Sequence, residues 1–314
     1  MAPAESLPSG ETVHERPTET SRWVLLVPLP LAGVLLAHVL IAPGDLSALF
    51  GSVGVSALWG GVLVLGLIAV TLAMPAWTAL RSSAARARRV AASPGTWLAV
   101  AVVAYFIMLT AISGRIAVLP VFDMFERHWQ GKVLDLIWLA ILFGTLRRWA
   151  RTEAGLRWSI RSGSARPALF AIGGVFAVFA ALTILSVAVD PASSTEVSAE
   201  QLAYDATIPN LTEELIWRGA MLAVLDRAFG TSRTVLGAPV GWGVVITAVA
   251  FGLGHTVLVD LSGTWSLNVA AGVFATVMGL ALGWIRARTG SIWPAFLLHC
   301  APELGVDIGM LIAA

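Results

Sequence analysis

The segment NLTEELIWRG, residues 210–219, places Glu213, Glu214 and Arg218 at the start of an apolar run. The whole chain is strongly apolar, since 57% of its residues are hydrophobic, only 12% are charged and the mean hydropathy is +0.82. Ordinary soluble domains carry about 25% charged residues. The composition therefore predicts an integral membrane protein. It also raises the question of why three ionisable side chains lie where a membrane helix is expected.

Nine apolar segments approach the length of about 20 residues that a helix needs to cross a bilayer. We therefore predict an all-α fold, a polytopic transmembrane helix bundle of about nine spans, with the functional motifs on the last four. The predicted spans are residues 23–43, 57–77, 97–119, 132–149, 167–189, 208–229, 237–258, 266–285 and 291–312.

Basic residues concentrate in alternate segments between these spans. The segments that hold most of the 20 lysine and arginine residues are 16–22, 81–95, 147–166, 227–233 and 286–288. By the positive-inside rule these segments face the cytoplasm. We thus predict a bacterial-type plasma-membrane protein with a cytoplasmic N-terminus and an external C-terminus. Its expected surroundings are the lipid bilayer, and no nucleic-acid partner is expected.

The chain divides into three parts by composition and motifs. Residues 1–22 are polar, so we predict a disordered cytoplasmic tail. Residues 23–190 form N-terminal transmembrane helices without a recognised motif, and residues 207–304 hold the motifs described below. A cleaved signal peptide is the alternative for the first span. Its apolar core would be about 7–15 residues long, which is shorter than the run observed here.

Four ionisable side chains in the last spans must be accommodated in the membrane, namely Glu213, Glu214, Arg218 and Glu303. An isolated charge at the bilayer centre costs about 2.5–3.5 kcal/mol, so we expect these groups to face one another or a wet cavity. Glu214 and Arg218 share one helix face, which predicts an ion pair. A salt bridge that only fixes packing explains this pair. It does not explain Glu213, which points about 100° away and has no cation at helical spacing.

Two further motifs place histidines on separate spans. FGLGH puts Phe251 and His255 one helical turn apart, and its glycines let a neighbouring helix come close. HCAPE puts His299 and Glu303 one turn apart on the last span. Either histidine alone is more typical of a packing group than of a catalyst. Together with Glu213, however, three helices each offer a group that can transfer a proton, which favours a catalytic site.

The motifs Glu-Glu-x-x-x-Arg, Phe-x-x-x-His and His-x-x-x-(Asn or Asp), in this order, resemble those of the CPBP or Abi intramembrane proteases. That family includes type II CAAX prenyl endopeptidases and bacteriocin-immunity relatives. The resemblance covers residues 207–304, about a third of the chain. At Glu303 the sequence departs from the family, which usually has Asn or Asp there. The matching residues are Glu213, Glu214, Arg218, Phe251, His255 and His299.

The resemblance implies an intramembrane endopeptidase that hydrolyses a peptide bond of a membrane-anchored peptide or protein, of the CAAX-like or peptide-precursor class. It implies that Glu213 is the general base, that His255 holds the same water, and that His299 donates to the developing oxyanion. Glu303 would assist His299. Supporting roles fall to Glu214, Arg218 and Phe251.

Two interpretations of the cofactor stay open. Two histidines and a glutamate also form catalytic zinc sites, and the family is often labelled metalloprotease. Zinc would then be bound by Glu213, His255 and His299. The sequence contains no His-Glu-x-x-His stretch, however, and the other interpretation is glutamate–histidine catalysis without a metal.

Two functions without proteolysis also agree with the sequence. A non-proteolytic membrane scaffold or bacteriocin-immunity protein of the same fold is favoured by the departure at Glu303. A proton-coupled transporter would use intramembrane glutamate and histidine residues as a proton relay. Against the transporter, the two halves of the sequence lack a matching pair of interrupted helices.

Overall fold

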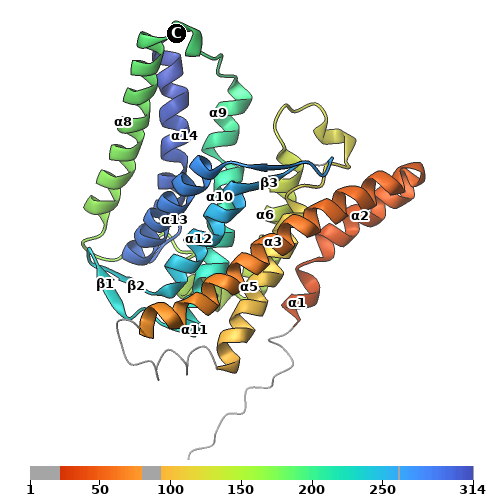
Figure 1. Cartoon of the computed structure of the whole chain (residues 1–314), viewed down its shortest axis with the longest axis horizontal. Helices are drawn as coiled ribbons and strands as arrows, with labels where there is room; N and C mark the ends of the chain where they lie inside the picture. Colours follow the sequence, from red (N-terminus) through yellow and green to blue (C-terminus); the bar gives the residue numbers. More distant parts are fainter. Residues whose placement is uncertain (1–21, 80–92, 261, 314) are drawn as a thin grey trace, which may run out of the picture.

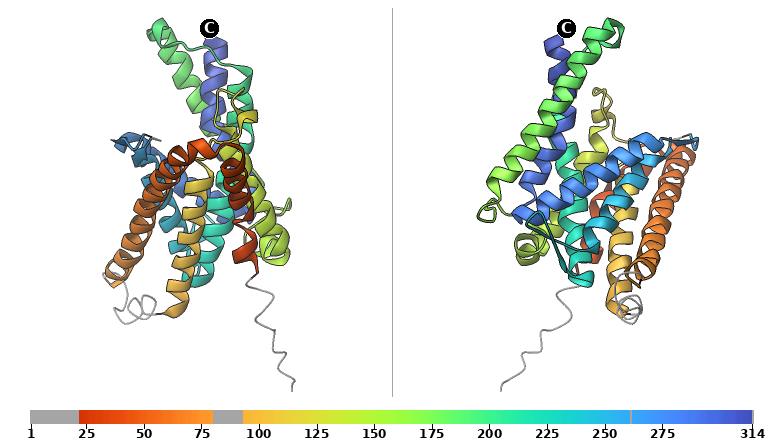
Figure 2. Two further views of the ribbon diagram at one scale, coloured as in Figure 1. Left: turned by 90° about the vertical axis from the view of Figure 1, so that its right-hand side faces the viewer. Right: turned by 60° about the vertical axis from the view of Figure 1, so that its left-hand side comes forward.

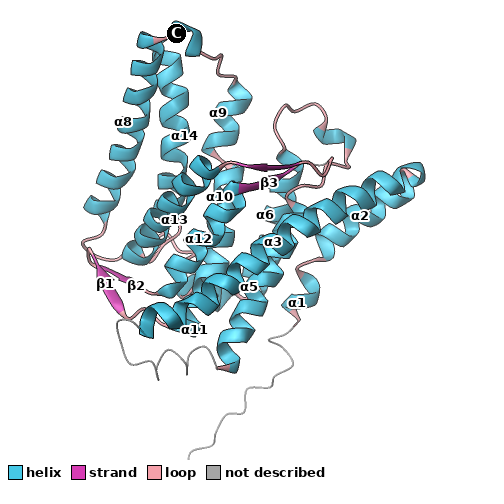
Figure 3. Cartoon of the chain, in the orientation of Figure 1, coloured by secondary structure: helices cyan, strands magenta, loops and turns pink. Residues whose placement is uncertain are grey.

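The computed structural model describes residues 22–79, 93–260 and 262–313 of the 314-residue chain. It is mostly helical, with two short hairpins (Figure 1, Figure 3). The predicted disordered tail, residues 1–22, lies outside the described residues apart from its last residue. Most of the basic segment 81–95 also lies outside them.

Six helical segments of the described chain are long and apolar enough to cross a membrane, which supports the prediction of an integral membrane protein. The count of nine spans is not confirmed. The six segments are Trp23–Ile41 with α1 (Trp23–Leu26) and α2 (Leu29–Ile41), Pro43–Ala73 with η1 (Pro43–Asp45) and most of α3 (Leu46–Ala79), α5 (Pro94–Ser113), α8 (Ala165–Val189), α13 (Val269–Thr289) and α14 (Trp293–Ala313).

The other three predicted spans are shorter or interrupted. α6 (Trp129–Thr145) has 17 residues and α12 (Trp242–Thr256) has 15. At these lengths they extend about 22–26 Å, less than the ~30 Å hydrocarbon core of a bilayer. Residues 208–229 form one helical stretch in three parts. These parts are α10 (Ile208–Glu214), the π-helix η4 (Leu215–Met221), which is buried along its whole length, and α11 (Leu222–Phe229).

Long helices pack in pairs along the bundle. α8 lies along α14, and α12 lies along α13 (Figure 1, Figure 2). The small residues of FGLGH allow the second of these contacts, because a Cβ atom at Gly252 would lie 1.8 Å from Thr276 Oγ1 on α13. Gly254 instead faces Trp59 of α3. The predicted close approach is confirmed, and α12 is held between α13 and α3.

The all-α prediction omits two short antiparallel hairpins. The turn of the first consists of Leu236 and Gly237, with φ values of 47° and 75°, as a two-residue hairpin turn with two positive φ values requires. Three-residue strands are too short to show an alternating pattern in the sequence. The hairpins pair β1 (Arg233–Val235) with β2 (Ala238–Val240), and β3 (Val257–Val259) with β4 (Trp265–Leu267).

Basic segments that were predicted to share one side of the membrane contact one another. Arg157 Nε donates to the carbonyl oxygen of Gly290 over 2.9 Å, and Arg288 Nη1 donates to that of Leu236 over 2.7 Å. The end of α14 and the acidic helix α9 (Ala199–Ala206) lie at the opposite end of the bundle from β1 and β2 (Figure 1). This grouping agrees with the prediction that the basic segments lie on one side of the membrane. The orientation itself stays a prediction.

Candidate active site

A small cavity of about 150 Å³ lies between the N-terminal helices and the segment that carries the motifs. Its lining includes Glu213 and His255, two of the predicted catalytic residues, and Lys132 and Asp135 from α6. α3 and α5 supply further wall residues, among them Trp59. The N-terminal helices therefore complete the site, although the sequence offered no role for them.

Glu213, the predicted general base, is paired with a lysine from another helix. Lys132 Nζ lies 2.6 Å from Glu213 Oε1, and the two side chains are only 19% and 24% exposed. Lys132 is the only lysine in the sequence. A charge-assisted bond of this length holds the Glu213 carboxylate in its ionised form. A search for cations at helical spacing misses this partner because it lies 81 residues away in the chain.

Glu214 forms the predicted ion pair with Arg218 and also binds a histidine. Arg218 Nη1 lies 2.7 Å from Glu214 Oε1, and His299 Nδ1 lies 2.8 Å from the same oxygen. The Glu214 and Arg218 side chains are 0% and 1% exposed. The ion pair is confirmed, and the structure adds a second role for Glu214. By accepting a hydrogen bond from Nδ1, its carboxylate fixes the orientation of the His299 ring.

The bond at Nδ1 decides what the other nitrogen of His299 can do. His299 Nε2 lies 3.9 Å from Glu213 Oε2, too far for a direct hydrogen bond. A neutral ring that donates from Nδ1 has only a lone pair at Nε2, so His299 can donate from Nε2 only as an imidazolium. The carboxylates of Glu213 and Glu214, one near each ring nitrogen, stabilise that protonated form.

Phe251 lies at the centre of the aromatic contacts of the site. Its ring centroid is 4.4 Å from Arg218 Cζ, 4.5 Å from the His255 centroid and 5.9 Å from the His299 centroid. His255 Nδ1 lies 2.8 Å from the carbonyl oxygen of Phe251. Since a carbonyl only accepts, this nitrogen donates, and Nε2 keeps its lone pair for a water or a substrate. Phe251 thus contacts both histidines and the buried arginine.

Glu303 bonds to a residue that the motif pattern does not single out. Its carboxylate accepts a hydrogen bond from Asn210 Nδ2. Asn210 is 4% exposed and also donates to the carbonyl oxygen of Asp205 over 2.7 Å. Burial, together with the nearby carboxylates of Glu303 and Asp307, raises the pKa of Asp205 to about 7. Among the described residues, neither Glu303 nor His299 lines the 150 Å³ cavity. The hydrogen bond of the Glu303 carboxylate goes to Asn210 and that of the His299 ring goes to Glu214, so the predicted direct help of Glu303 to His299 gains no support from these contacts.

Asp135 is a second buried acid in the cavity wall that motif matching misses. It accepts hydrogen bonds from Thr110 Oγ1 over 2.8 Å and from Trp138 Nε1 over 2.7 Å, and another from Ser113 Oγ. These bonds join α5 to α6 within one turn of Lys132. The sequence signal was present, because an ionisable pair spaced Lys-x-x-Asp inside an apolar helix needs partners.

The arrangement does not fit a zinc ion bound by Glu213, His255 and His299. Within the described parts of the chain, no three His, Cys, Asp or Glu side chains lie close enough together to hold one metal ion. Glu213 also forms an ion pair with the Lys132 ammonium, whose positive charge repels a divalent cation at the same carboxylate.

Part of the chain matches a known protein family. Residues 197–304 match the family model described as "Type II CAAX prenyl endopeptidase Rce1-like". No curated protein and no solved structure matches the chain significantly. The matched residues contain Glu213, His255 and His299 but do not include α6 with Lys132.

Proposed function

We propose that the chain is an intramembrane endopeptidase, because its residues 197–304 match the Rce1-like type II CAAX prenyl endopeptidase family model. Its substrate would be a membrane-anchored peptide or protein of the CAAX-like or peptide-precursor class. The observation that carries the proposal is the placement of Glu213 and His255 in one cavity, with the oriented ring of His299 beside Glu213.

Water would be activated between Glu213 and His255. Because Oε1 of Glu213 is bonded to Lys132, Oε2 is the oxygen that can take a proton. The Nε2 lone pair of His255 would accept a hydrogen bond from the same water. As the water oxygen bonds to the carbonyl carbon, its proton passes to Glu213 and then to the departing amine when the C–N bond breaks. Glu213 thereby returns to its carboxylate form.

The negative charge of the tetrahedral intermediate would be stabilised by His299. In its imidazolium form the ring donates from Nε2, and Glu214 keeps the ring in place. A preorganised donor of this kind contributes about 2.7–4 kcal/mol to catalysis in other proteases. Glu303, through Asn210, would hold α14 against α10 and would act on His299 only through the position of the helix.

This proposal is tested with protein reconstituted in liposomes, a library of membrane-anchored peptides, and mass spectrometry of the products. Glu213→Gln and His255→Ala should each abolish cleavage per mole of folded protein; the amount of folded protein is measured separately, because Glu213→Gln also leaves Lys132 without its partner. Glu196→Gln, at an exposed position before α9, is the matched control and should cleave like the wild type. Full activity of Glu213→Gln would end the glutamate-base mechanism.

A non-proteolytic membrane scaffold is a second candidate, and the Lys132–Glu213 ion pair favours it. A carboxylate that is already paired with an ammonium accepts a proton less readily, which weakens it as a general base. The library experiment separates the two candidates. If the wild type cleaves no peptide and Lys132→Met gains cleavage, the natural protein acts by binding, as a bacteriocin-immunity relative would.

A further inference from the structure

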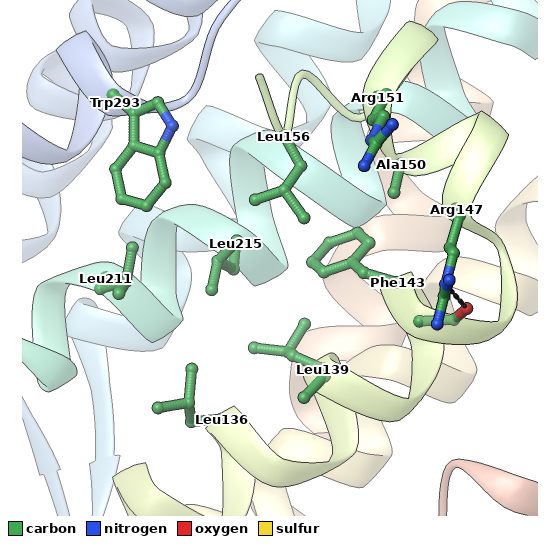
Figure 4. Close-up of a pocket in the computed structure, with 12 residues that line it drawn as sticks. Leu136, Leu139, Phe143, Arg147, Ala150, Arg151, Leu156, Leu211, Leu215 and Trp293 are labelled. Atoms are coloured by element: carbon green, nitrogen blue, oxygen red, sulfur yellow. Dashed lines mark hydrogen bonds between the residues drawn. The ribbon is translucent and has the colours of Figure 1, made fainter. Parts of the chain in front are cut away.

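A larger cavity lies beside the candidate active site and takes no part in the proposed chemistry. Its volume is about 430 Å³, within the range of about 300–1,000 Å³ that is usual for small-molecule sites. Its walls come from α6, the short helix α7 (Arg147–Thr152), α10, η4 and the start of α14 (Figure 4). It is therefore a space between helices that could hold a molecule from the membrane.

The lining of this cavity is apolar except at one end. Among the described residues that line it, the charged ones are Arg147 and Arg151. Figure 4 shows the two arginines on one side and Trp293 and Leu211 across the cavity from them. Both arginines are exposed, and neither forms an ion pair with another described residue. Toward the described residues, Arg147 donates from Nε alone, to the carbonyl oxygen of Gly144 over 3.1 Å.

A molecule that binds here needs an apolar part for the leucine-lined space and an anionic group for the end with the two arginines. A peptide would bring backbone N–H and C=O groups that need partners, and the leucine and phenylalanine side chains of the lining offer none. A hydrocarbon chain has no such requirement. A phosphate group would pair with the two guanidinium groups, and basic pockets between membrane helices bind anionic lipid headgroups elsewhere. We propose that the cavity binds an anionic phospholipid of the bilayer, with its phosphate at Arg147 and Arg151 and an acyl chain reaching Trp293.

The two cavities share their walls. α6 presents Leu136 and Leu139 to the lipid cavity and Lys132 to the active-site cavity. The stretch formed by α10 and η4 presents Leu215 to the first and Glu213 to the second. An acyl chain between these helices would therefore support the two elements that bring Lys132 and Glu213 together.

Tryptophan quenching by brominated lipids tests the proposal without any measurement of proteolysis. The full-length protein is placed in phosphatidylcholine nanodiscs that contain a fraction of phosphatidylglycerol or phosphatidylcholine with brominated acyl chains. The signal of Trp293 is the difference between the wild type and Trp293→Phe. Since each arginine near the membrane surface contributes about fivefold to the binding of an anionic lipid, we expect phosphatidylglycerol to be preferred roughly 30-fold.

Three variants locate the bound lipid. Arg147→Gln with Arg151→Gln should abolish the preference for phosphatidylglycerol. The matched control is Arg148→Gln with Arg166→Gln, which removes the same charge from exposed positions outside the lining. This control should keep the preference for phosphatidylglycerol. Ala140→Phe narrows the cavity without touching the arginines and should reduce quenching of Trp293 by both lipids.

Several results would overturn the proposal. Equal quenching by both lipids in the wild type would show that the arginines do not select the headgroup. Quenching that Ala140→Phe leaves unchanged would place the contact with Trp293 outside the cavity, in the bulk membrane. A lack of quenching by either lipid would show that protein covers the cavity, for example a second copy of the chain. A loss of protease activity alone would bear on the proposed function and not on this site.

Discussion

Removal of the Lys132 ammonium should destabilise the folded protein through Glu213. The two charges lie 2.6 Å apart in side chains that are 19% and 24% exposed. Loss of one partner from a fully buried pair costs about 3–5 kcal/mol, because the other charge stays in an apolar environment. Some solvent reaches this pair, so we expect the lower end, about 3 kcal/mol, for Lys132→Met. Lys132→Arg keeps the charge and should cost less.

A double-mutant cycle isolates the interaction. The free energy of unfolding is measured in detergent for the wild type, Lys132→Met, Glu213→Gln and the double variant. We expect a coupling energy of about 2 kcal/mol, which is roughly a 30-fold effect on the unfolding equilibrium. The pair Arg227 and Glu153 is the control, since it is 3.7 Å apart with side chains 75% and 39% exposed. Such surface pairs are worth about 0–1 kcal/mol.

Additive effects of the two substitutions on the free energy of unfolding would contradict an interaction between Lys132 and Glu213. If the effects of Lys132→Met and Glu213→Gln sum to that of the double variant within about 0.5 kcal/mol, the two side chains do not interact in the folded protein. Glu213 would then have no fixed cation. The Lys132 ammonium would then neither oppose zinc at the Glu213 carboxylate nor select Oε2 as the basic oxygen.

Three other outcomes are expected. Metal chelators should leave any proteolysis unchanged, because the site residues do not fit a zinc ligand set; activity that is lost and then restored by zinc would contradict this. Burial raises the pKa of Asp205 from 3.8 to about 7, so its contribution to stability is fully present below about pH 4 and is lost as the pH rises through about 7. Asp205→Asn should remove that loss in a series of Tm values against pH, and parallel curves for the two proteins would disprove it. Glu303→Gln should keep most stability because its amide oxygen still accepts from Asn210. Glu303→Ala leaves one N–H of that amide with only the weak acceptor Cys300 Sγ, 3.7 Å away, which should cost about 1 kcal/mol, the lower end for a buried donor without a good partner. Equal unfolding free energies would show that the bond to Glu303 contributes nothing.

Contacts within one helix were predictable from the sequence. Residues four apart meet on a helix in every fold, so the pairs Glu214–Arg218 and Phe251–His255 follow from spacing alone. The divergence of Glu213 from Glu214 follows in the same way. The general class of fold was predictable as well, because apolar runs of bilayer length have few other interpretations.

Contacts between helices were not predictable. A membrane helix is apolar on nearly every face, so its sequence does not show which face meets a neighbour. The sequence therefore does not show which residues pair with Lys132 and Asn210. It does indicate that each has a partner, because an ionisable or amide group inside an apolar helix needs one. The span count of nine is not confirmed for a related reason. α12 and α6 are apolar but too short, and sequence boundaries alone do not reveal where a helix ends.

The 150 Å³ cavity is lined partly by the segment that matches the family model, residues 197–304, and partly by helices that precede it. Under the proposed function, the matched segment supplies the reacting groups, whereas α3, α5 and α6 shape the opening through Trp59, Thr110 and Lys132. A relative could keep all three motifs, change its first helices, and thereby present the same chemistry to a different peptide. Under this proposal, the groups that react and the groups that select the substrate lie in different parts of the chain. Under that proposal, a graft of residues 23–145 between relatives should transfer the choice of substrate, and it should leave the reaction unchanged only where the grafted α6 keeps a lysine at the position of Lys132.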